Sequence, residues 1–422
     1  MAWNLRKDVQ RRILILGMLV LPSILLLGRI NLKLRDYQPE PCTTLYCSAV
    51  NLFHGLFESY SSSLRFAALT LTARGPVSDL VQDIGGFRGL VRREDAYPII
   101  QLAAQELGLD WRVDHRSTHP PTAFLFVSSI AFLPWNVATT IWAWFMLALC
   151  AATFRCYGAP WKVAIGLTPV ALLWQPVALS LGQFTIVWLF ALAMAHRLAE
   201  RREFYSGVCI ALAALPKFFA SFLLLYFLIN RKWRAPLGFA LVWLISLLII
   251  FLLNPNAISQ YLSVNTINSE QMIRRADNAS LIINSYRSGG LFFLFLVGLL
   301  FMQIIRAHIY SDLRPPAERS IGLWFILTYF SVVLLPVFWI YSVTPLLPVI
   351  LYLILSKRSL AAAATGWCCL ALPNLSPGFG VASIVPLVSV SVLVGVGLLL
   401  HEMGCGSPTV EEVGATPRTE NY

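Results

Sequence analysis

The sequence predicts an all-α polytopic membrane protein with about 10–12 transmembrane helices and a long first extracytoplasmic loop. Of its 422 residues, 57% are hydrophobic and only 13% are charged, whereas roughly 25% are charged in a soluble domain. The mean hydropathy is +0.69, and the apolar residues fall in blocks of about 15 to 25, the length that crosses a bilayer core of about 30 Å. This composition excludes an ordinary cytosolic enzyme. Because the blocks run almost to the C-terminus, it also excludes a single anchored ectodomain.

Basic residues outnumber acidic ones by 32 to 21, which gives a net charge of +11. In a membrane protein this excess is typical of short cytoplasmic loops that face an anionic leaflet. No basic domain is large enough for a nucleic-acid interface, so membrane lipid is a predicted partner and nucleic acid is not.

The first apolar block, residues 13–30, is preceded by a basic cluster that places the N-terminus in the cytoplasm. No small-residue cleavage site follows the block, which predicts an uncleaved first span of a multi-pass cell-membrane protein. The basic cluster consists of Arg6, Lys7, Arg11 and Arg12.

Residues 31–119 form the predicted first extracytoplasmic loop and hold ten of the 21 acidic residues. Loops of this length are uncommon unless they fold or function. Residues 79–92 and residues 98–107 place apolar side chains at steps of three and four, which predicts two interfacial helices. Pro98 is expected in the first turn of the second helix.

The rest of the chain completes a single predicted domain, residues 1–400. It contains a second external segment, residues 254–288, and a disordered polar tail follows at residues 401–422. Further spans are predicted at residues 121–134, 136–154, 163–179, 183–197, 205–230, 236–253, 289–305, 320–337, 342–356, 360–373 and 380–400.

Two cytoplasmic markers, residues 197–203 and 231–234, are separated by about 30 residues, too few for two full crossings. A hairpin of two short helices with its apex near Pro216 and Lys217 resolves the conflict; one long span with Lys217 at mid-depth is the alternative. Either way a lysine lies at membrane depth, where it is costly without a partner. Lys217 is therefore either a snorkelling residue or the counter-charge of a bound anion.

Polar residues near predicted span ends are the candidates for chemistry. Asp79 and Asp83 lie four residues apart, on one face of the predicted interfacial helix, either as solvated surface acids or as functional carboxylates. Gln183 heads an apolar block and could bind a ligand or cap a helix. His119 is either an interfacial turn residue or part of the site.

The second external segment ends in polar residues that could face the same cavity: Asn278, Ser280, Tyr286 and Arg287. Cys42 and Cys47 lie in the polar first loop, where a disulfide and two free thiols are both open. No spacing is typical of a nucleotide-binding loop, a zinc-ligand pair or a Ser-His-Asp arrangement, so no metal site is predicted.

Several short motifs follow one another along the chain. Asp79 stands 18 residues before Tyr97, and His119-Pro120-Pro121 comes next. The later motifs are Leu181-Gly182-Gln183-Phe184, Ala213-Ala-Leu-Pro-Lys217-Phe-Phe, Asn278-Ala-Ser280 and Pro336-Val-Phe-Trp339-Ile-Tyr341.

In this order and spacing the motifs resemble glycosyltransferase family 87, the polyprenyl-phosphate-mannose-dependent α-mannosyltransferases of the GT-C superfamily, over roughly residues 10–360. The chain departs from the family pattern at three positions. His119 replaces a tyrosine, Phe184 replaces an asparagine, and Tyr341 replaces a histidine.

The resemblance implies a GT-C-like fold and an inverting glycosyltransferase. It moves a sugar, mannose in that family, from a polyprenyl-phosphate co-substrate to a hydroxyl of a glycan or glycolipid on the extracytoplasmic face. Because the leaving phosphate is already anionic, one carboxylate suffices as general base, and no cofactor is required. Asp79 is the predicted base, and Lys217, with Arg88 or Arg287, is predicted to bind the phosphate. The predicted substrate-binding residues are Asp83, Tyr97, His119, Gln183, Asn278, Ser280, Trp339 and Tyr341.

Two other classes of function remain open from the sequence. A polytopic transporter or lipid flippase accounts for the many spans, but it predicts internal repeats and leaves the long first loop without a role. A non-catalytic membrane scaffold is compatible with the three departures from the family motifs.

Overall fold

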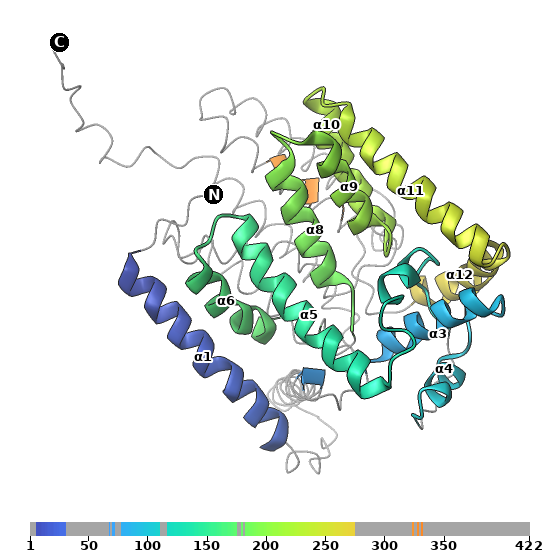
Figure 1. Ribbon diagram of the computed structural model, residues 1–422, viewed down its shortest axis with the longest axis horizontal. Helices are drawn as coiled ribbons and strands as arrows, with labels where there is room; N and C mark the ends of the chain where they lie inside the picture. Colours follow the sequence, from blue (N-terminus) through green and yellow to red (C-terminus); the bar gives the residue numbers. More distant parts are fainter. Residues whose placement is uncertain are drawn as a thin grey trace, which may run out of the picture.

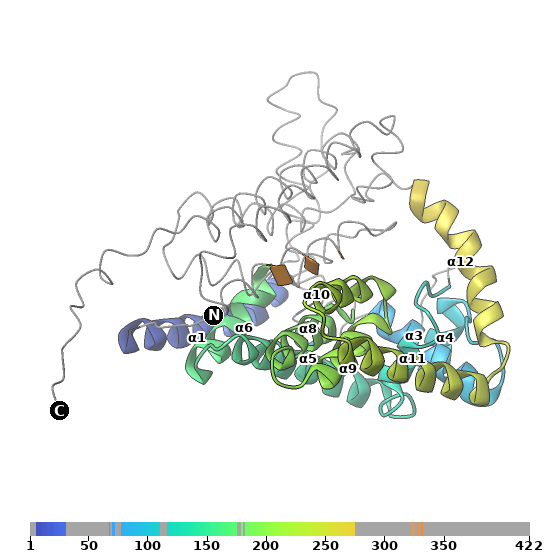
Figure 2. The ribbon, with the colours of Figure 1, turned by 90° about the horizontal axis from the view of Figure 1, so that it is seen from above.

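The computed structural model describes residues 6–30, 77–109, 116–174 and 182–274, with the single positions 67, 70, 71, 179, 323, 324, 327, 328 and 331. This part of the chain is helical: it contains no β-strand, and one isolated bridge joins Ile99 to Arg116. Most of the helices lie in one layer, from which α12 turns away (Figures 1 and 2). The helices are α1 (Lys7–Ile30), α3 (Ser78–Arg92), α4 (Ile100–Glu106), η2 (Ala123–Val127), α5 (Trp135–Cys156), α6 (Trp161–Trp174), α8 (Thr185–Leu198), α9 (Glu203–Ala214), η3 (Phe218–Leu223), α10 (Leu224–Ile229), α11 (Arg234–Leu253) and α12 (Ala257–Arg274).

In this described part, two helices are long and apolar enough to cross a membrane, α5 and α11. The α11 helix buries few of its side chains, and Leu244, for example, is 65% exposed. An exposed face made of Leu, Ile and Phe suits lipid contact, because lipid tails are as apolar as these side chains. The larger count of 10–12 spans remains a prediction.

Glycines set the closest helix contacts. Gly17 of α1 faces Gly166 of α6, and a Cβ on either residue would collide with the backbone of the other helix. The same holds between α9 and α11, where Gly207 faces Ala235 and Gly238 faces Phe204. Small residues that allow backbones to approach are typical of helix packing in membranes.

The chain between α8 and α11 folds as the predicted hairpin. The α9 helix, about 18 Å long, ends before Pro216, and the chain returns through η3 and α10. The two ends meet, since Lys232 Nζ lies 2.7 Å from Glu200 Oε2 and donates a hydrogen bond to the Ala199 carbonyl. One long span through this segment is therefore wrong.

Two predictions, one in the first loop and one for the segment that follows it, need correction. The helices α3 and α4 occur as expected, but α4 begins at Ile100, so Pro98 precedes its first turn. Residues 121–134 form η2 and turns instead of a membrane span. Prolines bracket this short segment, and Phe124 is buried against Gly86 of α3, which fixes the segment on the loop helix.

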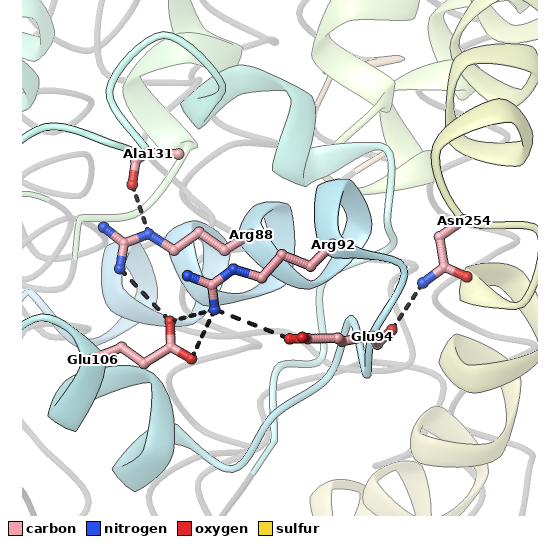
Figure 3. A network of polar contacts seen from close by, with 6 residues as sticks. All are labelled: Arg88, Arg92, Glu94, Glu106, Ala131 and Asn254. Atoms are coloured by element: carbon pink, nitrogen blue, oxygen red, sulfur yellow. Dashed lines mark hydrogen bonds and ion pairs between the residues drawn. The ribbon is translucent and has the colours of Figure 1, made fainter.

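The two polar segments that were predicted to be external contact each other. Asn254, after α11, donates a hydrogen bond from Nδ2 to the Glu94 carbonyl (2.8 Å, Figure 3). Gln260 of α12 accepts one from the Ala96 amide (3.1 Å). The segment that starts at residue 254 and the first loop thus lie on one side of the molecule.

Candidate functional site

The N-terminus of α3 is held against the turn that precedes α8. Val77 adopts left-handed backbone angles (φ 39°, ψ 54°), an unusual conformation for a β-branched residue. Gly182 also has a positive φ of 73°, and a Cβ on it would collide with Val77 and meet Leu80 at 3.0 Å. Only glycine satisfies both the backbone angle and the close approach. This contact brings Gln183 to the first turn of α3.

Asp79 lies in that first turn and is partly buried. Its Oδ1 accepts a hydrogen bond from Ser78 Oγ (3.2 Å), and its Oδ2 accepts one from Gln183 Nε2. Burial raises the pKa of Asp79 from its ordinary value of 3.8 to about 6, with Asp83 adding to the rise and His119 and Lys217 opposing it. At neutral pH the carboxylate is ionised, yet it is a stronger base than a solvated aspartate.

Asp83 lies one turn further along α3 and is fully buried, and His119 is only 4% exposed. Asp83 Oδ1 and His119 Nδ1 are 2.9 Å apart. The other oxygen, Asp83 Oδ2, has no hydrogen-bond partner among the described residues. The two aspartates are therefore not solvated surface acids.

The backbone and ring of His119 are fixed by three neighbours. Tyr97 donates a hydrogen bond from its hydroxyl to the His119 carbonyl (3.1 Å), and the His119 amide donates to Ser117 Oγ (3.2 Å). The imidazole packs against the ring of Phe184, 5.5 Å between centroids. Tyr97 is thus brought to the site through the backbone of His119.

Lys217 lies at the apex of the α9–η3 hairpin. Its Nζ is 5.8 Å from the centre of the Trp188 ring, a cation–π arrangement. It is also close enough to Asp79 and Asp83 to interact with both carboxylates electrostatically. The apex is tied to the loop because Thr122 Oγ1 donates to the Leu215 carbonyl (2.6 Å). The charge of Lys217 thus lies near an aromatic ring and two carboxylates, and its role as the counter-charge of a bound anion remains a prediction.

Arg88 is engaged elsewhere on α3. It follows Asp79 by nine positions, about two and a half turns, which places the two side chains on different faces. Its Nε donates to the Ala131 carbonyl (2.8 Å), and its Nη1 lies 3.7 Å from Glu106, which also pairs with Arg92 (Figure 3). The structure does not bring Arg88 together with Asp79.

The structure thus joins Asp79, Asp83, His119, Gln183 and Lys217 into one cluster, which we call the polar cluster. Gln183 holds Asp79 rather than capping α8, whose cap is Phe184. The other predicted site residues lie outside the described residues: Cys42, Cys47, Asn278, Ser280, Tyr286, Arg287, Trp339 and Tyr341.

Three supporting residues were not predicted from the sequence: Ser117, Val77 and Trp188. The glycine of the Leu181-Gly182-Gln183 motif was the one available signal for the contact with Val77, because an isolated glycine indicates close backbone approach. Within the described ranges, no group of three or more His, Cys, Asp or Glu side chains could hold a metal ion.

The chain belongs to glycosyltransferase family 87, whose family model matches residues 118–336, more than half of the 422 residues. It is therefore a glycosyltransferase, and its family and apolar helices indicate a membrane protein. The matched range includes His119, Gln183 and Lys217, while Asp79 and Asp83 precede it. No curated protein and no solved structure matches the chain.

Replacing Gly182 by alanine is expected to lower stability by about 1–3 kcal/mol and to reduce glycosyl transfer, because the added Cβ displaces Val77 and with it Asp79. The matched control is Gly108→Ala, which has a similar φ of 74° but no neighbour within 4 Å. Thermal unfolding and transfer assays on both variants separate backbone strain from the collision. Equal losses of stability together with wild-type transfer in both variants would contradict this account of the contact.

Proposed function

We propose that the chain is an inverting glycosyltransferase that moves a sugar from a polyprenyl-phosphate donor to an acceptor hydroxyl on the extracytoplasmic face. The proposed sugar is mannose. The observation that carries the proposal is the polar cluster: a partly buried carboxylate, Asp79, within electrostatic range of a cation, Lys217, in a chain of family 87. The acceptor is a glycan or glycolipid. No cofactor takes part, and the lipid-linked sugar is a co-substrate.

The proposed step uses one base and one phosphate ligand. Asp79 removes the proton of the acceptor hydroxyl as that oxygen forms a bond to the sugar carbon. The bond from that carbon to the donor phosphate breaks on the opposite face, and its electron pair stays on the phosphate oxygen. The configuration at the carbon is thereby inverted. Lys217 stabilises the released phosphate, whose charge needs a cation and not a proton.

The surroundings of the polar cluster suit a lipid donor. The cluster lies where the polar loop helix α3 meets the hairpin apex, and the neighbouring α5 and α11 carry exposed apolar faces. A polyprenyl tail can lie among such side chains while its phosphate reaches the loop. The alternative of a transporter or flippase has no comparable support, because the chain belongs to a glycosyltransferase family.

The test is donor consumption by purified protein in a membrane mimic, supplied with labelled polyprenyl-phosphate mannose, glucose and arabinose and with the corresponding nucleotide sugars. We expect consumption of one lipid-phosphate sugar and a product of inverted configuration. Use of a nucleotide sugar alone would contradict the proposed donor class, and no consumption of any donor would favour a non-catalytic scaffold.

A further inference from the structure

The His119–Asp83 pair is not used by the proposed step. Both side chains are almost entirely buried, with 2.9 Å between Nδ1 and Oδ1. Asp83 Oδ2 has no partner in the described part of the chain. A buried carboxylate with one oxygen unsatisfied is costly, so its negative charge must be balanced by a nearby cation. The closest candidate is the imidazole itself.

The charges that face His119 come from two elements. The α3 helix supplies Asp79 and Asp83, and the hairpin apex supplies Lys217. Burial alone would lower the pKa of His119, but the two carboxylates outweigh burial and Lys217, and the pKa is raised above its ordinary value. With His119 protonated, the polar cluster holds two carboxylates and two cations. With His119 neutral, the cluster carries excess negative charge that opposes an anionic donor.

We propose that protonated His119 is the second cation of the donor-phosphate site, and that Asp83 is the positioning residue that keeps it oriented and charged. This inference rests on the proposed function. Tyr97 and Ser117 hold the histidine backbone and Phe184 holds its ring, so the imidazole is preorganised before the donor arrives.

The inference sets the pH dependence of the two steps. Donor binding weakens as pH rises through the pKa of His119, because the second cation is then lost. Proton removal by Asp79 requires pH above about 6, because that carboxylate must be ionised. At a limiting donor concentration, the transfer rate therefore rises as the pH increases past the pKa of Asp79 and falls as the pH increases past the pKa of His119.

The experiment measures the Kd of polyprenyl-phosphate mannose without acceptor, between about pH 6 and about pH 9, for the wild type and three variants. The donor is a phosphodiester with one constant charge, so the titration reports the protein. His119→Gln is expected to bind about tenfold more weakly at low pH and to lose the alkaline weakening. His119→Lys is expected to restore tight binding and to keep it at high pH. In Asp83→Asn the affinity for the donor is expected to fall at a lower pH than in the wild type, because the histidine loses its counter-charge.

Two results would overturn the inference. The first is that His119→Gln binds the donor with the affinity and the pH dependence of the wild type. The second is that the affinity of His119→Lys still falls at high pH as it does in the wild type, which would assign that fall to Lys217. In either case the wild type still binds and transfers, and the proposed function stands. If the wild type binds no lipid-phosphate sugar, the proposed function itself fails. Thermal unfolding of each variant confirms that it is folded, and the gain from glutamine to lysine is a change that a purely structural histidine would not produce.

Discussion

Replacing Asp79 by asparagine is expected to lower glycosyl transfer by about 10²–10⁴-fold, the usual contribution of a general base, while donor affinity changes little. The amide oxygen can still accept the hydrogen bond from Gln183 Nε2, and the amide NH2 can donate to Ser78 Oγ in place of the bond that Ser78 gave, so the geometry at the start of α3 is kept. The measurement compares the transfer rate at saturating donor with the Kd of the donor. In the wild type, the acid limb of transfer is expected near pH 6, the pKa of Asp79.

The same substitution is expected to stabilise the fold. Because the pKa of Asp79 is higher in the folded state than its ordinary 3.8, the ionised carboxylate costs stability above about pH 6, and this cost disappears below about pH 4. Asp79→Asn should therefore raise the free energy of unfolding at neutral pH by on the order of 1 kcal/mol after solvent screening, which thermal unfolding detects as a higher midpoint temperature. Asp8→Asn, at an exposed position of α1, is the control with no expected effect on either property. Wild-type transfer by Asp79→Asn would remove Asp79 from the mechanism.

Replacing Lys217 by methionine is expected to weaken donor binding by about 10- to 100-fold, the loss of one charge-assisted contact to a phosphate. Methionine is unbranched and close to lysine in length, so it removes the charge over the Trp188 ring with little change in side-chain volume at the hairpin apex. The measurement is the Kd of polyprenyl-phosphate mannose at neutral pH. Lys217→Arg should retain more affinity than Lys217→Met, because it keeps the charge.

Lys162→Met is the matched control, since Lys162 is exposed on α6. It removes the same charge from the protein without touching the polar cluster, and no change in donor affinity is expected. Unchanged donor binding in Lys217→Met, with a normal thermal midpoint, would show that the lysine serves the fold and not the phosphate.

Several features were predictable from local rules. The positions of α3, α5 and α11 follow from apolar periodicity and block length. The hairpin between α8 and α11 follows from counting residues between two basic markers, and the Lys232–Glu200 ion pair confirms it. The membrane span predicted at residues 121–134 was wrong, because the apolar content of a segment does not distinguish a span from a buried loop that packs on another helix.

The arrangement of the polar cluster depended on contacts between distant parts of the chain. Spacing alone put Asp79 and Asp83 on one helix face and left open whether they are solvated surface acids. Only the tertiary contacts with Gln183 and His119 showed that they are not. Arg88 shares their helix, yet Glu106 and Ala131 occupy its side chain.

Apolar composition and residue periodicity thus indicated a helical membrane protein, because both act over a few turns of chain. That the chain is a glycosyltransferase follows from its membership of family 87. The charge state of Asp79 and His119 depends on which groups from α3, the first loop and the hairpin apex meet in a buried place. That meeting is set by long-range packing, for which the order of residues along the chain carries no direct signal.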